Sequence, residues 1–152
     1  MKPTLILTIF LFIAISSLGQ ITNPNLDSTL AKSLGADDYG MKKYVLVILK
    51  TGSNTSTNKT TADSLLAGHL KNINRLADLK KLIVAGPFGK NENDFRGIFI
   101  LDVTSFEEAK KLLETDPAIK AKLLESSLYN WYGSAALPEY QKTDDKIRKY
   151  KF

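Results

Sequence analysis

The apolar positions of the chain predict four short strands joined by two main helices. Runs of apolar residues on consecutive positions, typical of strands buried on both faces, occur four times. They lie at residues 43–50, 82–85, 97–103 and 127–132. Gly86 and Pro87 are expected to end the second strand, because proline cannot donate a ladder hydrogen bond. Polar residues between strands predict loops at residues 51–59 and 89–94.

The first main helix is predicted between the first two strands. It is expected to begin at Thr60, where Asp63 follows three residues later as in a capping box, and to end near Lys81. Apolar residues recur at helical spacing on one side: Leu66, Leu70, Ile73, Leu76 and Ala77. His69 falls on this side, so we expect it to point inward rather than into solvent.

The second main helix is predicted after the third strand. Thr104 is expected to cap it, with Glu107 completing a second capping box. Asp116-Pro117 then predicts a further short helix that runs to residue 124, since a carboxylate caps well and proline needs no N–H at the first position. Another short helix is predicted at Ser28–Leu34.

The order strand, helix, strand, strand, helix, strand predicts an α+β fold. One four-stranded antiparallel sheet with both helices on one face satisfies it, which is the ferredoxin-like βαββαβ arrangement. The helices then cover a single face of the sheet, although the strands are apolar on both faces. The second face therefore needs a cover, and we expect the same sheet from another copy to supply it in a homodimer.

The N-terminal residues have the pattern of a secretory signal peptide. Lys2 is followed by a nearly unbroken apolar run at residues 5–15, and Ser17 and Gly19 are small residues at cleavage positions. The run is shorter than the roughly 20 residues of a spanning helix. We therefore expect export, to the periplasm or outside the cell, with no stable membrane insertion after cleavage. The predicted segments are a signal peptide (1–19), a linker (20–42), a folded domain (43–134) and a basic tail (135–152).

Composition excludes several kinds of function. The net charge of +5 is concentrated between residues 142 and 152, where five basic residues face two acidic ones. The folded body then lacks the basic face that nucleic-acid binding requires, and the tail is expected to be a solvated, partly disordered end. The chain has no cysteine and one histidine, which excludes disulfides and a metal cage of several His and Cys ligands. We predict no cofactor and no metal.

Several motifs, in order along the chain, resemble the YCII-related (YciI-like) family. They are Gly68-His69-Leu70, Leu-Ile-Val-Ala-Gly-Pro at residues 82–87, the strand at 97–101, Ser-Phe-Glu-Glu-Ala at 105–109 and Glu-Thr-Asp-Pro at 114–117. The resemblance covers residues 43–131. It implies a dimeric α/β barrel built from two ferredoxin-like halves. Lyase-like elimination chemistry is associated with part of the family, although an export signal departs from its usual cytosolic members.

The resemblance also implies a pocket with a catalytic histidine and aspartate, here His69 and Asp116. By its pattern alone, a single inward histidine is more often a satisfied core residue, and Asp116 is equally a helix cap. The two roles of Asp116 are compatible, because a capping carboxylate still has a lone pair to offer. Histidine exchanges protons near neutral pH when a partner fixes its tautomer, so the pair would suit general acid–base catalysis.

Three further residues are candidates for the pocket: Gly86, Pro87 and Trp131. Glycine and proline here more often shape a strand end, and Trp131 more often packs in a core or dimer interface. Two functions stay open. The first is a cofactor-free, lyase-like enzyme for a small organic molecule. The alternative is a non-catalytic dimer that binds a small molecule or serves as a scaffold. A haem protein is a third, less favoured reading, because related dimeric barrels bind haem through one histidine.

Overall fold

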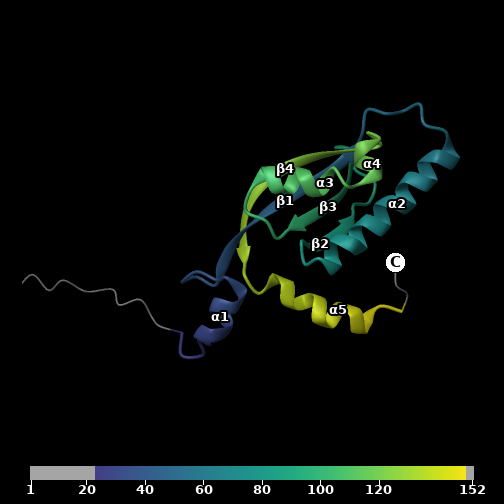
Figure 1. The fold of residues 1–152 in the computed structure, drawn as a ribbon. Coiled ribbons are helices and arrows are strands. Elements are labelled where there is room, and N and C mark those ends of the chain that lie inside the picture. The colour runs from purple at the N-terminus through teal and green to yellow at the C-terminus, as the bar shows by residue number, and fades with distance from the viewer. Residues whose placement is uncertain (1–22, 150–152) are drawn as a thin grey trace, which may run out of the picture.

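The structure is a computed structural model that describes residues 23–149 (Figure 1). The signal peptide predicted at residues 1–19 lies outside the described residues. The elements follow in this order: α1 (Ser28–Leu34), β1 (Met41–Thr51), α2 (Lys59–Asp78), β2 (Leu82–Pro87), β3 (Phe95–Leu101), α3 (Phe106–Leu113), α4 (Pro117–Lys120), β4 (Leu124–Ser134), the 3-10 helix η1 (Leu137–Tyr140) and α5 (Gln141–Ile147). No helix between residues 23 and 149 has the length and apolar character needed to cross a bilayer.

The four strands form one antiparallel sheet in the order β2-β3-β1-β4. Together with the chain order β1-α2-β2-β3-α3-β4, this is the ferredoxin-like arrangement, so the predicted α+β class is confirmed. The two central strands are β1 and β3. Because β2 and β4 flank them, both edges of β1 and β3 form backbone hydrogen bonds with a neighbouring strand.

The helices α2, α3 and α4 cover one face of the sheet (Figure 1). Alternate residues of β1, namely Val45, Val47 and Leu49, point into the core beneath them, since side chains of a strand alternate between faces. Each helix contributes one or more buried residues: Leu76, Ala109, Leu113 and Ala118. We call this side of the sheet the helix face.

The opposite side, which we call the open face, is also apolar. Tyr44, Ile83 and Ile100 form a second buried cluster there. Partly buried residues extend this cluster across the sheet: Leu46, Val84, Trp131 and Leu137. Tyr129 lies opposite Leu46 in the register and is 50% exposed. The strands are thus apolar on both faces, as the sequence pattern indicates.

Several predicted element ends are wrong by one to four residues. The cap of α2 is Asn58, which accepts a hydrogen bond from the Thr61 amide; Asp63 pairs instead with the Lys59 ammonium. The cap of α3 is Ser105 rather than Thr104. In both cases the neighbouring polar residue competes for the same cap, and local sequence does not rank the two.

Strand β2 continues through Gly86 and Pro87, which were expected to end it. Pro87 pairs with Gly97 of β3. Because β2 is an edge strand, a residue there that lacks an N–H is tolerated on the outward side. The short helix after Asp116 ends at Lys120 instead of residue 124, and β4 begins at Leu124.

The C-terminal segment is more ordered than predicted. Residues 137–147 form η1 and α5, and the Tyr140 hydroxyl donates a hydrogen bond to the Ile83 carbonyl at 2.7 Å. The Gln141 amide donates to the carbonyls of Leu82 and Ile83. These contacts anchor the segment on β2, although none of the residues in η1 or α5 is buried.

Candidate functional site

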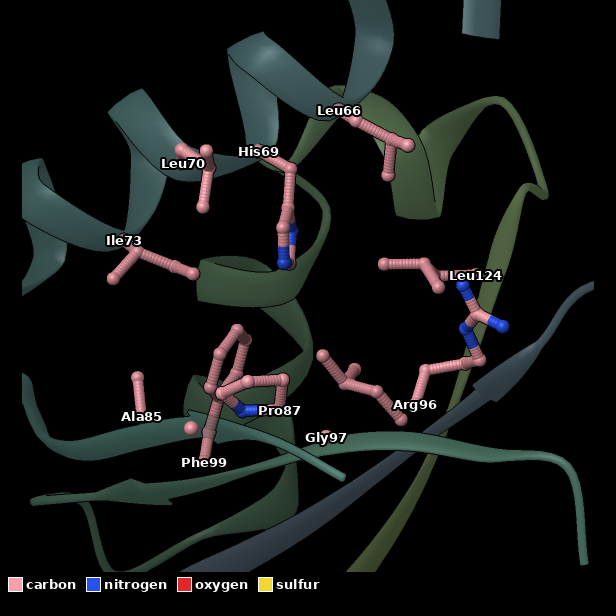
Figure 2. A pocket seen from close by; sticks show the side chains of 12 residues that line it. Leu66, His69, Leu70, Ile73, Ala85, Pro87, Arg96, Gly97, Phe99 and Leu124 are labelled. Carbon is pink, nitrogen blue, oxygen red and sulfur yellow. The ribbon is translucent and has the colours of Figure 1, made fainter. Parts of the chain in front are cut away.

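A cavity of about 340 Å³ lies between α2 and the helix face of the sheet (Figure 2). Most of its lining is apolar, and the residues with ionisable side chains are His69 and Arg96. The lining residues come from α2, the ends of β2 and β3, and the adjoining parts of β1 and β4: Leu49, Leu66, His69, Leu70, Ile73, Ala85, Gly86, Pro87, Arg96, Gly97, Phe99 and Leu124. A concave, apolar cavity with a few polar groups is typical of a small-molecule site.

The side chain of His69 points from the middle of α2 into this cavity (Figure 2). Its side chain is 12% exposed, and its ring stacks on that of Phe99 with centroids 5.9 Å apart. Nδ1 is bonded to Asp116, whereas no described residue forms a hydrogen bond with Nε2. The histidine is therefore held on one edge and leaves its other nitrogen for a bound molecule.

Asp116 is buried and uses both of its carboxylate oxygens. Oδ2 lies 2.6 Å from Nδ1 of His69. Oδ1 accepts hydrogen bonds from the amides of Ala118 and Ile119 at the start of α4. Asp116 is thus a helix cap and the partner of His69 at the same time, which are the two roles that the sequence left open.

The surroundings of Asp116 keep it ionised. Burial raises the pKa of the carboxyl. The hydrogen bond and charge of His69 and the two α4 amides lower the pKa by more, so that it falls below its ordinary value of 3.8. An ionised carboxylate only accepts hydrogen bonds. In the neutral imidazole Nδ1 must then carry the proton, which leaves the Nε2 lone pair as a base that points into the cavity.

A polar network behind the pair was missed by the sequence reasoning. Asn72 is buried on α2, and its side-chain amide lies 3.4 Å from Asp116 Oδ2. Its Oδ1 accepts hydrogen bonds from the Arg75 guanidinium group and lies 3.0 Å from Thr115 Oγ1. A polar residue three positions after His69 on an apolar helix side was the available signal. This network restricts both the carboxylate and the turn that carries it.

Two glycines permit the close approaches that shape the site. A Cβ built on Gly68 would lie 2.6 Å from Cγ of Pro117, so a glycine is needed where α2 meets α4. A Cβ on Gly97 would lie 2.7 Å from the Gly86 carbonyl oxygen, where β3 meets β2 under the cavity. The glycine of Gly68-His69-Leu70 therefore sets the distance between the histidine and the aspartate.

Of the three further candidates for the pocket, Gly86 and Pro87 line the cavity and Trp131 does not. Trp131 pairs with Tyr44 across β4 and β1, and the two rings lie 5.5 Å apart on the open face. Strand alternation thus turns Trp131 away from His69. Within residues 23–149, no group of three or more His, Cys, Asp or Glu side chains is arranged to hold a metal ion.

The profile of the YCII-related domain matches residues 43–131. Among solved structures, the chain is similar to 5-chloro-2-hydroxyhydroquinone dehydrochlorinase (TftG) from Burkholderia phenoliruptrix AC1100 in complex with 2,5-dihydroxybenzoquinone. The identity is 24% and the TM-score 0.42, over 57% of this chain and 92% of that chain. No curated protein matches the chain.

Proposed function

Since the chain belongs to the YCII-related domain family, we propose that it is an enzyme in which His69 and Asp116 act as an acid–base pair. Its substrate would be a small organic molecule, and its reaction a lyase-like elimination that needs no cofactor. The observation that carries the proposal is the 2.6 Å contact between Nδ1 and the buried carboxylate, at the wall of an apolar cavity.

The chemistry assigned to the pair is a proton transfer from carbon. Nε2 of His69 takes a proton from a C–H bond next to an electron-withdrawing group, and the electron pair of that bond forms a new C=C bond. The leaving group departs with its bonding electrons from the neighbouring carbon. The proton on Nε2 is then released, which regenerates the neutral imidazole.

Asp116 supports this step without taking the proton itself. It accepts the hydrogen bond from Nδ1, which fixes the tautomer, and its charge stabilises the imidazolium that forms. Burial of the two side chains strengthens this interaction, because charges shielded from water are screened poorly. Asn72 restrains the carboxylate from behind through a longer contact to the same oxygen.

A panel of small carbonyl compounds and phenols, each bearing a β-chloride or β-hydroxyl leaving group, tests the function. The protein is incubated with each compound in D2O, and proton NMR follows C–H to C–D exchange and loss of the leaving group. Turnover by the wild type should fall about 100-fold or more in His69→Gln. Turnover that persists in His69→Gln would exclude the mechanism, and no turnover of any compound would favour a non-catalytic role.

The alternative function is a non-catalytic dimer that binds a small molecule or serves as a scaffold. The feature that favours a dimer is the open face, where Tyr44, Ile100 and Trp131 lie among other apolar residues. We propose that a second copy of the same face covers it, because a two-fold pairing makes one apolar surface its own complement. A dimer is compatible with either function.

We also propose that the protein is exported. Lys2, the apolar run at residues 5–15 and the small residues before Gln20 support this assignment. Mass spectrometry of the protein recovered from a secreting host should give an N-terminus at Gln20. An intact N-terminus would contradict cleavage.

A further inference from the structure

Arg96 reaches the cavity because β3 contains a β-bulge. In the register of β1 with β3, Leu49 pairs with Gly97 and Lys50 pairs with Phe95, so Arg96 has no partner on β1. Without the bulge, alternation would place Arg96 on the open face with Ile98. A bulge adds one residue and re-aims the side chains around it. Here it turns Arg96 to the helix face, where its side chain lines the cavity.

The bulge separates two cationic side chains that are close in the sheet. Lys50 lies over the ring of Phe95, with Nζ 5.3 Å from the ring centroid, and does not line the cavity. Arg96 instead rises from the sheet at the edge of the cavity, with its guanidinium group beside Leu124 (Figure 2). The ammonium group of Lys50 thus lies outside the cavity, whereas the side chain of Arg96 lines it.

Within residues 23–149, no acidic side chain forms an ion pair with Arg96 and no group accepts a hydrogen bond from its guanidinium group. The rest of the wall is apolar apart from His69. A guanidinium group is always charged and presents a planar set of donors that matches a carboxylate or phenolate. It is therefore the complementary group for an anion in a cavity that offers no anion of its own.

We propose that Arg96 anchors the anionic group of the ligand, and that the cavity selects small organic acids with an apolar body. The carboxylate or phenolate pairs with Arg96 at the sheet side, and the apolar body lies along Leu70 and Phe99. The carbon next to the anionic group then faces His69. The position of the reacting carbon rests on the proposed function, whereas the binding of the anion does not. A volume of about 340 Å³ is near the lower end of small-molecule sites, which favours ligands of one or two rings.

Binding of matched acids and amides tests the proposal. The probes are acetate, benzoate and 2-naphthoate, with acetamide, benzamide and 2-naphthamide as neutral counterparts of the same shape. Titrations followed by amide NMR signals of Gly86 and Gly97 report on the cavity directly. The wild type should bind benzoate or 2-naphthoate at least about tenfold more tightly than the corresponding amide, because an ionic hydrogen-bonded pair adds to the apolar contact. Arg96→Gln should remove this preference and leave the affinity for the amide unchanged.

Lys50→Gln is the matched control, since it removes a nearby positive charge that does not line the cavity. The preference for acids should survive in it. Equal binding of acids and amides by the wild type, absence of binding by every acid, or a preference that persists in Arg96→Gln would overturn the proposal. Arg96-dependent binding together with turnover that is unchanged in His69→Gln would instead refute the proposed function alone.

Discussion

Gly68 of α2 lies against Pro117 of α4 so closely that a Cβ on the glycine would stand 2.6 Å from Cγ of the proline ring. The proline ring is rigid, so neither side can give way by a rotamer change. Their neighbours in the chain, His69 after Gly68 and Asp116 before Pro117, form the 2.6 Å contact. The geometry of the pair thus depends on a residue that has no side chain.

We expect Gly68→Ala to destabilise the protein by about 1–3 kcal/mol, because the added methyl group pushes α2 away from α4. The direction is informative, since alanine in a helix otherwise adds roughly 0.5–1 kcal/mol of stability over glycine. Urea unfolding measures the change. Gly89→Ala, where a Cβ meets nothing within 4 Å, is the control and should stay near the wild type. A Gly68→Ala protein more stable than the wild type would contradict the close contact.

Asp116→Asn should reverse the tautomer of His69. The cap amides of Ala118 and Ile119 require an oxygen at the Oδ1 position, so the new amide presents its NH₂ group to Nδ1. Nδ1 then becomes an acceptor and the proton moves to Nε2, where it blocks the base. Nitrogen-15 NMR of the single histidine distinguishes the two tautomers.

The control for this experiment is Asp102→Asn, which breaks the Lys42–Asp102 ion pair and leaves the cavity intact. It should retain the wild-type tautomer. A proton on Nε2 in the wild type itself would show that the carboxylate does not set the tautomer.

The free energy of unfolding should depend on pH through the ionisation of Asp116. Its pKa in the folded state is lower than the ordinary 3.8, so the folded state favours the carboxylate. The resulting stabilisation is complete above the unfolded pKa and is lost as the pH falls through the folded pKa. We therefore expect the stability advantage of the wild type over Asp116→Asn to be larger at about pH 7 than at about pH 3. Urea unfolding at both pH values tests this, and an unchanged difference would argue against a depressed pKa.

Tyr129→Glu should weaken the proposed homodimer. Tyr129 lies on the open face and is 50% exposed, so the substitution places a charge in the interface without emptying the core. Light scattering after gel filtration should show a shift from dimer to monomer at micromolar concentration. Tyr39→Glu changes a tyrosine that is 75% exposed, outside the open face, and should leave the mass unchanged. A wild-type protein that is monomeric at high concentration would refute the dimer.

Sequence alone determined the class of fold, and the resemblance to the YCII-related family suggested His69 and Asp116 as a pair. Apolar periodicity is a local property, and it specified the order of strands and helices. Asp116-Pro117 is likewise a local signal, because the carboxylate that caps α4 is two residues from the amide it serves. The inward side of α2 placed His69 correctly for the same reason.

Only the tertiary structure decided how these elements meet. His69 and Asp116 are 47 residues apart, and their contact depends on the packing of α2 on α4 at Gly68. Asn72 is buried because α2 packs against the turn that carries Thr115 and Asp116. The bulge that turns Arg96 into the cavity, and the alternation that turns Trp131 out of it, follow from strand register. Register is set by pairing between distant segments, so no local pattern of residues determines which side chains finally share the cavity.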